Sequence, residues 1–153
     1  MRRNLLVVFV VLLTAGTTNL FALDKANGGG WFTVGFVPPP GPSDAEANFG
    51  FNAKYTRRGV QGHLNYHNRA TGLTVNGPVT DFSPGSCPDT GEATAVLSGF
   101  CKDGSCSFEF EVIDNGEPGK GRDRICRYHV FENDEGPDSN FDRLLNSGNI
   151  QVR

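Results

Sequence analysis

The 153-residue sequence lacks the features that define several large classes of protein. It contains a single Met and no stretch in which apolar residues recur at the period of a helix, so long helices are not expected. Its 14 Lys and Arg residues are outnumbered by 17 Asp and Glu residues, which argues against nucleic acid and anionic membranes as partners. It has no Gly-x-Ser-x-Gly motif, no His-Glu-x-x-His motif and no phosphate-binding loop, so motif-defined hydrolases and nucleotide-binding enzymes are not indicated.

The long apolar run that the sequence does contain lies at its start. Arg2 and Arg3 precede an unbroken apolar stretch from Leu5 to Leu13, and the segment ends near the small residue Ala22. This order is typical of a secretory signal peptide, and the run is shorter than the roughly 20 residues that span a bilayer. We therefore predict a signal peptide over residues 1–22, a secreted or periplasmic location, and no transmembrane segment after the leader is removed.

Residues 23–153 are enough for a single domain with its own core. Without Arg2 and Arg3, this part keeps 12 of the 14 basic residues against 17 acidic ones, a formal net charge of −5. It also holds all four cysteines, which are Cys87, Cys101, Cys106 and Cys126. An even number of cysteines in an exported chain predicts two disulfides, and the close ligand pairs of a zinc site are missing.

Short runs of alternating apolar and polar residues recur along the exported part, with turn residues between them. They predict strands at 30–37, 48–56, 60–67, 73–82, 93–101, 106–114, 124–131 and 148–152. Short links favour antiparallel neighbours, so we expect an all-β meander of about eight strands in a closed or partly open small barrel. A two-sheet β-sandwich is the alternative, and residues 134–145 are the one place where a short helical turn fits.

Large apolar residues occupy one face of each predicted strand. Phe108 and Phe110, for example, alternate with Glu109 and Glu111. An eight-stranded barrel has an interior that such bulky side chains fill, so we expect a packed core without a large ligand cavity. Glu109 and Glu111 are expected on the outer face, with Glu109 opposite Arg127, and without a cleft they do not indicate catalysis.

The predicted register favours one pairing of the cysteines. The turn at 102–105 places Cys101 opposite Cys106, and the next hairpin brings Cys126, pointing inward, near Phe110. Cys106 and Cys126 are then roughly 13 Å apart, beyond the roughly 7 Å reach of a disulfide. We therefore predict the disulfides Cys101–Cys106 and Cys87–Cys126.

Three acidic residues bracket a loop rich in Gly and Pro: Asp114, Glu117 and Asp123. Carboxylate oxygens on a loop are the ligands that calcium prefers, although their spacing is not that of an EF-hand. The ordinary alternative is a shaped turn in which Asp123 pairs with a neighbouring arginine. Calcium is the one cofactor that this pattern suggests.

Aromatic and histidine residues supply the other candidate ligand-binding positions: Trp31, His63 and His67. Trp31 and Phe32 follow three glycines, and one of these rings is expected to close the barrel end, whereas an exposed Trp31 would stack on a sugar. His63 and His67 share one face of a strand, and His129 points outward from another. The three histidines suggest a transition-metal site, whose ordinary alternative is a solvated outer face.

Five segments in a fixed order carry a resemblance to a known family. They are Gly28-Gly29-Gly30-Trp31-Phe32, Phe49-Gly50-Phe51-Asn52-Ala53-Lys54, Gly62-His63-Leu64-Asn65-Tyr66-His67, Asp114-Asn115-Gly116-Glu117-Pro118-Gly119 and Gly148-Asn149-Ile150-Gln151-Val152. Together they resemble the post-COAP domain, a small exported bacterial module, over about residues 26–153. The resemblance implies a β-rich extracytoplasmic domain often found within larger surface proteins, with no established activity and no catalytic residues. The four cysteines depart from that family's pattern.

These observations predict an exported, non-enzymatic β-domain that acts as a surface, matrix or envelope binding or structural module. Its partner would be extracellular or in the envelope, and the sequence does not identify it. The alternative is a small secreted hydrolase or carbohydrate-active enzyme. That alternative requires a cleft lined by converging polar residues.

Overall fold

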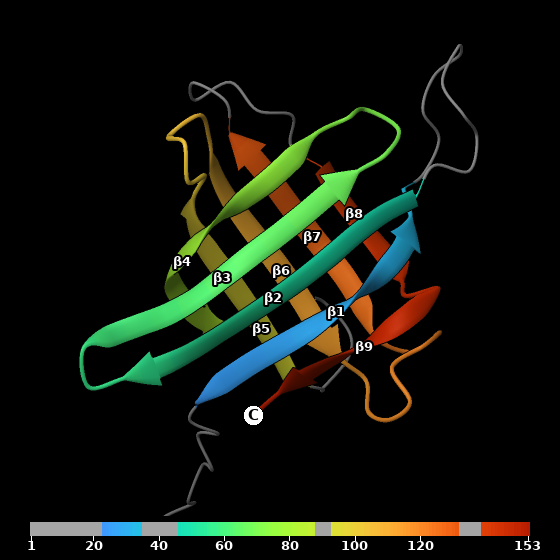
Figure 1. Cartoon of the computed structure of the whole chain (residues 1–153). Helices are drawn as coiled ribbons and strands as arrows, with labels where there is room; N and C mark the ends of the chain where they lie inside the picture. Colours follow the sequence, from blue (N-terminus) through green and yellow to red (C-terminus); the bar gives the residue numbers. More distant parts are fainter. Residues whose placement is uncertain (1–22, 35–45, 88–92, 132–138) are drawn as a thin grey trace, which may run out of the picture.

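A computed structural model describes residues 23–34, 46–87, 93–131 and 139–153. These residues form an all-β fold of nine antiparallel strands in a meander, which curls strongly into a half-barrel (Figure 1). The strands are β1 (Lys25–Thr33), β2 (Glu46–Thr56), β3 (Gly59–Asn68), β4 (Thr74–Pro84), β5 (Ala93–Phe100), β6 (Ser107–Asp114), β7 (Arg124–Phe131), β8 (Ser139–Leu144) and β9 (Ser147–Val152). Within these ranges no helix has the length and apolar character needed to cross a membrane. The signal peptide expected at residues 1–22 lies outside them and stays a prediction.

The sheet has the strand order β8-β7-β6-β5-β4-β3-β2-β1-β9, and every neighbouring pair is antiparallel. This confirms the predicted all-β meander and its partly open barrel. In Figure 1 the strands β9, β1, β2 and β3 cross in front of β5 to β8, so the sheet folds over on itself. The strand β4 belongs to both halves, because its first part pairs with β3 and its second part with β5.

The sheet bends at β4, where a bulge and two glycines occur. The pairing of β4 with β5 shifts register within residues 79–81, and such a bulge bends a strand and increases its twist. A Cβ atom at Gly77 would collide with the carbonyl oxygen of Phe100, and one at Gly99 would collide with that of Pro78. The two glycines therefore let the backbones approach closely where the sheet turns.

The two edge strands, β8 and β9, follow each other in the chain. β8 pairs with β7 at one end of the sheet, and β9 pairs with β1 at the other. Between them, the Leu145 amide donates to the carbonyl of Asp123 (2.9 Å) and the Asn146 amide donates to the carbonyl of Trp31 (3.0 Å). Residues 139–152 therefore tie the two ends of the curled sheet together at one corner.

Aromatic rings occupy the inside of the curl. Phe32, Tyr66 and Phe110 are at most 2% exposed. The ring centroids of Phe49 and Phe110 lie 6.2 Å apart, and those of Tyr66 and Tyr128 lie 5.1 Å apart, distances typical of packed aromatic pairs. Full burial of one such side chain stabilises the fold by roughly 1.5–3 kcal/mol, so this aromatic core is a main source of stability.

Two elements differ from the sequence prediction. Residues 139–144, within the stretch expected to form a helical turn, form β8 instead, because pairing with β7 overrides a polar sequence of low strand preference. β1 spans Lys25–Thr33, whereas a strand was expected at 30–37, of which residues 35–37 lie outside the described part. It begins earlier because its glycines let β9 approach, and a Cβ atom at Gly30 would collide with the carbonyl oxygen of Ser147.

The structure contains the disulfides Cys87–Cys126 and Cys101–Cys106, the pairing that the predicted register favoured. The detailed register was wrong by two residues, because Phe110 lies opposite Tyr128 and not near Cys126. A bulge in the β6–β7 pairing accounts for one of the two residues, since the partner of Glu111 is Arg127 and the partner of Val112 is Ile125. The extra residue, Cys126, was expected to point inward, and the bulge places it on the outer side with Arg127.

Candidate functional site

The outer side of β9, β1, β2, β3 and β4 carries three rows of paired residues that run across the strands. From β9 to β4 they are Ser147–Trp31–Asn48–His67–Thr74, Asn149–Gly29–Gly50–Asn65–Asn76 and Gln151–Asn27–Asn52–His63–Pro78. We call these three rows the amide face. Side chains alternate along a strand, and the residues between them, such as Ala47 and Phe49, are buried in the core.

The amide face is polar but uncharged. Its amide side chains are Asn27, Asn48, Asn52, Asn65, Asn76, Asn149 and Gln151, and its three rows contain no Lys, Arg, Asp or Glu. Charged side chains border it on three sides. Glu46 and Arg69 form an ion pair of 3.1 Å at one margin, where Arg69 Nε also lies 3.1 Å from the Asn48 amide, and Lys25 lies opposite Lys54 at the other margin. At β9 the Glu117 carboxylate is bonded to Asn149 and Gln151. A ligand on this face therefore meets donors and acceptors rather than a net charge.

The middle row of the amide face has no side chains on β1 and β2, between Asn149 on β9 and Asn65 on β3, and we call this gap over Gly29 and Gly50 the furrow. Gly29 and Gly50 lie opposite each other there, and a Cβ atom at Gly50 would meet no atom within 4 Å. Trp31 and Asn48 flank the furrow on one side. The structure separates the two rings, one of which was expected to close the barrel end: Phe32 is fully buried in the core, and Trp31 is half-buried on the outer side.

A groove of about 480 Å³ adjoins the amide face at β4. Its floor includes Thr74 and Asn76 from the rows above, and its wall is the turn between β5 and β6, with Lys102 and Asp103. The Lys102 amide donates to the carbonyl of Asn76 (2.7 Å), and the disulfide between Cys101 and Cys106 closes the turn. Hydrogen bonds from Ser105 hold the pKa of Asp103 below its ordinary value, so this carboxylate is ionised at neutral pH.

The loop between β6 and β7, residues 115–123, borders the amide face at β9, and we call it the acidic loop. Glu117 Oε1 accepts hydrogen bonds from Gln151 Nε2 (2.9 Å) and Asn149 Nδ2 (2.7 Å), and these bonds hold the pKa of Glu117 below its ordinary value. The Gly119 amide donates to Asn149 Oδ1 (2.8 Å). The loop and the β5–β6 turn thus stand at opposite ends of the rows, about 19 Å apart at the usual strand spacing.

The structure gathers the three acidic residues that suggested calcium along the free edge of β9. Asp123 Oδ2 accepts from the Ile150 amide (2.6 Å), and Asp114 Oδ2 accepts from the Val152 amide (2.9 Å). Asp123 is fully buried, and this burial raises its pKa, with smaller contributions from the negative charges of Asp114 and Glu117. The carboxylates therefore satisfy amides of an edge strand that would otherwise lack partners.

We expect calcium to leave the thermal stability unchanged. Both oxygens of Asp114 and of Asp123, and one oxygen of Glu117, already accept hydrogen bonds from the protein. A cation would have to displace these bonds before it gained ligands. The check is a thermal melt with and without about 5 mM CaCl₂, in which a site with a micromolar Kd would give a clear rise in Tm. Such a rise would restore the calcium interpretation.

The histidines are divided between the two halves of the sheet. His63 and His67 lie on the outer side of β3, in two different rows of the amide face, and His67 Nδ1 lies 2.9 Å from Thr74 Oγ1. His129 is on β7, opposite Glu109. Four strand positions separate β3 from β7 in the sheet, so the structure does not bring the three histidines together as a metal site.

Glu111 differs most from its predicted environment. It was expected on the open outer face, but its side chain is 1% exposed, and Arg127 lies opposite it rather than opposite Glu109. The segment after β4 covers it: the Ser86 amide donates to Glu111 Oε1, and Arg127 Nη1 lies 3.9 Å from Glu111 Oε2. A tertiary crossing that no strand pattern encodes thus explains its burial.

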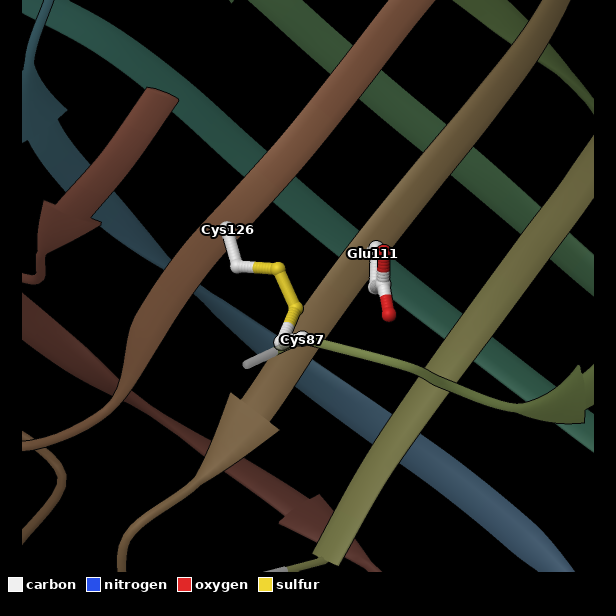
Figure 2. Close-up of side chains that lie close together, drawn as sticks. All are labelled: Cys87, Glu111 and Cys126. Atoms are coloured by element: carbon white, nitrogen blue, oxygen red, sulfur yellow. A yellow bond between two sulfur atoms is a disulfide. The ribbon is translucent and has the colours of Figure 1, made fainter. Parts of the chain in front are cut away.

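Figure 2 shows the disulfide Cys87–Cys126 beside the Glu111 side chain. The two sulfur atoms and a Glu111 oxygen lie within 4.8 Å of one another. In the disulfide the two sulfurs are bonded to each other, so they are not the thiolate ligands that a metal needs. This cluster therefore anchors residues 85–87 to the outer side of β6 and β7.

Fold and site define an all-β domain with two disulfides and an uncharged polar face. Comparison with protein-family models, curated proteins and solved structures gives no match. The resemblance to the post-COAP domain stays a prediction from the five segments quoted above.

Sequence reasoning singled out Trp31, His63 and His67 but missed the amides and the two glycines between them. A signal was available, because β2 places Asn48, Gly50 and Asn52 on the side opposite its buried aromatic residues. These positions form one continuous surface only because the register of five strands aligns them. Alternation along a strand predicts which side chains share one side of the sheet, and strand pairing determines which of them lie in the same row.

Proposed function

We propose that this chain is an exported, non-enzymatic β-domain that binds a surface, matrix or envelope component through the amide face. The two disulfides indicate an oxidising, extracytoplasmic environment, which agrees with the predicted signal peptide. The observation that carries the proposal is the open furrow over Gly29 and Gly50, flanked by Trp31 and by amides. An aromatic ring beside a few converging polar groups is the kind of lining that ligand sites use.

The acidic residues support a binding role over a hydrolytic one. Glu111, Asp114 and Asp123 accept hydrogen bonds from backbone amides, so each of these carboxylates holds the fold together. Paired catalytic carboxylates need a shared cleft in which a substrate reaches both. The carboxylates that border the rows are Glu117 at β9, Asp103 in the groove at β4, and Glu46, which is paired with Arg69 beside the first row.

The test is a pelleting experiment with the disulfide-bonded protein and the insoluble envelope and matrix fraction of the source cells. We expect the protein to sediment with this fraction and Gly50→Val to reduce the bound share roughly tenfold, because a blocked site loses at least 1.4 kcal/mol of binding. Ser98→Val is the matched control, since it adds the same side chain to β5 in the other half of the sheet. Equal sedimentation of both variants would show that the amide face is not the binding site.

A further inference from the structure

We infer that the ligand of the amide face is an uncharged polysaccharide whose chain lies across the strands, from the furrow on β1 and β2 past Asn65 and Asn76 to the groove at β4. This inference rests on the proposed function and adds the chemical class of the ligand. It joins four features of the described residues: the neutral rows, the glycine furrow, Trp31 beside it, and the groove.

The charge of the face selects a neutral ligand. Its three rows contain no ionisable side chain other than His63 and His67. The charged groups around them are single and of both signs: Glu117 at β9, the ion pair of Glu46 with Arg69 beside the first row, and Lys102 with Asp103 in the groove at β4. A polyanion needs clustered Lys and Arg, and a basic polymer needs clustered carboxylates, and neither cluster occurs in the rows. A neutral ligand rich in hydroxyl groups loses nothing by this arrangement.

The amides match the hydrogen bonding of sugar hydroxyls. Each Asn or Gln side chain offers two donors and an acceptor, and each sugar hydroxyl offers one donor and two acceptor positions. Asn76 Nδ2 donates to Asn65 Oδ1, which orients both side chains and leaves the second polar atom of each amide for a ligand. The contact of His67 Nδ1 with Thr74 Oγ1 orients the ring in the same way. Side chains held in place lose less entropy when a ligand binds.

Trp31 supplies the apolar contact that a sugar ring needs. The C–H groups on one side of a pyranose are apolar and slightly positive, and the face of an indole ring is negative, so the two stack. Trp31 lies in the first row, opposite Asn48 and beside the furrow. A ring stacked on Trp31 therefore lies beside amide groups that its hydroxyls can reach.

The dimensions favour a chain over a single sugar. From β1 to β4 the rows extend about 14 Å at the usual strand spacing, and the groove of about 480 Å³ continues from Thr74 and Asn76. The furrow floor at Gly29 and Gly50 lets a linear ligand lie low between the flanking side chains. Several sugar units fit along this path, and shallow sites of this kind gain affinity from repeated contacts.

The test is affinity gel electrophoresis of the full disulfide-bonded protein in gels that contain one polysaccharide each. The neutral probes are hydroxyethylcellulose, laminarin and galactomannan, and the charged probe is polygalacturonate. The variants are Gly50→Val, which fills the furrow, Trp31→Ala, which removes the stacking ring, and Ser98→Val as the matched control. Gly50 has an ordinary extended backbone with open space above it, so Gly50→Val is expected to keep the Tm at or above that of the wild type.

We expect at least one neutral probe to retard the protein, with little change between about 0.05 and 0.5 M NaCl because no charge is neutralised. Gly50→Val and Trp31→Ala should each weaken this binding roughly tenfold or more, and Ser98→Val should not change it. Retardation by polygalacturonate alone, or by none of the probes, would overturn the ligand class.

The outcomes separate this inference from the proposed function. If the neutral probes fail but Gly50→Val still abolishes sedimentation with the envelope fraction, the amide face binds a ligand of another class. If a neutral probe binds Gly50→Val as well as wild type, both the furrow and the proposed site are wrong. If the protein binds neither the probes nor the envelope fraction, the proposed function fails with the inference.

Discussion

Replacement of Cys87 and Cys126 by serine is expected to lower the free energy of unfolding by about 4 kcal/mol. The two cysteines are 39 residues apart in sequence, and the bond between them removes many conformations from the unfolded chain. The loss is largest for long loops, so the same replacement at Cys101 and Cys106, with a separation of 5, should cost only about 2 kcal/mol. A domain of this size then loses roughly 10 °C in Tm without the longer bridge.

The longer bridge also fixes residues 85–87, which cover the Glu111 side chain. Without it, residues 85–87 are held by the Ser86 amide bond to Glu111 and by the Gly85 amide bond to the carbonyl of Thr94 (3.2 Å). Opening of this cover would break the Ser86 amide bond to Glu111, and this loss adds to the effect of chain entropy.

The measurement is urea unfolding of the wild type and both serine double variants without reductant, followed by near-UV circular dichroism. The double variant of Cys101 and Cys106 is the control for loss of a disulfide as such. Equal destabilisation by the two double variants would contradict the assignment of the larger role to the Cys87–Cys126 bridge.

Replacement of Asp123 by alanine is expected to destabilise the protein by about 2–4 kcal/mol. Its carboxylate accepts from the amide of Asn115 (2.9 Å) and from the amide of Ile150 (2.6 Å), and the residue is fully buried. Alanine leaves both amides without these acceptors, and an unpaired buried amide costs about 1–3 kcal/mol. Because Ile150 belongs to β9, we expect the loss to detach this edge strand first.

The pH dependence of stability provides a second readout for Asp123. Burial raises its pKa above the ordinary value of 3.8, so the folded protein binds this proton more tightly than the unfolded chain does. Its contribution to the free energy of unfolding is therefore fully present below pH 3.8 and declines as the pH rises through the raised folded-state pKa. Asp123→Asn cannot titrate, so wild type should gain stability over this variant as the pH falls from 7 towards 4.

The experiment combines Asp123→Ala and Asp123→Asn with hydrogen exchange of the β9 amides. We expect faster exchange at Ile150 and at Val152 in the alanine variant, and a smaller effect in the asparagine variant, which keeps one acceptor. A stability difference between wild type and Asp123→Asn that stays constant with pH would show that burial does not perturb this carboxyl group.

Local sequence patterns predicted most of the strands, because apolar residues alternate with polar ones where one side of a strand is buried. β2 is the clearest example: Phe49, Phe51 and Ala53 alternate with polar or glycine positions, and the structure buries all three. The same reasoning failed for β8, where few apolar residues record a buried side, and pairing with β7 determines the conformation. It also failed for Glu111, because the chain that covers it comes from residues 85–87.

The candidate site depended even more on distant contacts. Trp31 and Asn48 are neighbours across two strands, and no local pattern states that they share a row. The acidic loop is a second example. Asp114 and Asp123 resemble calcium ligands in the sequence, but in the structure they accept hydrogen bonds from amides of β9.

The sequence by itself determined an all-β meander, the side of most strands that faces the core, and which cysteines pair, because these follow from alternation and short turns. Only the tertiary structure decided the curl of the sheet, the burial of Glu111 and the alignment of the amide face. The physical reason is that bulges and close glycine contacts set strand register and bending, and their positions depend on partners far away in the chain.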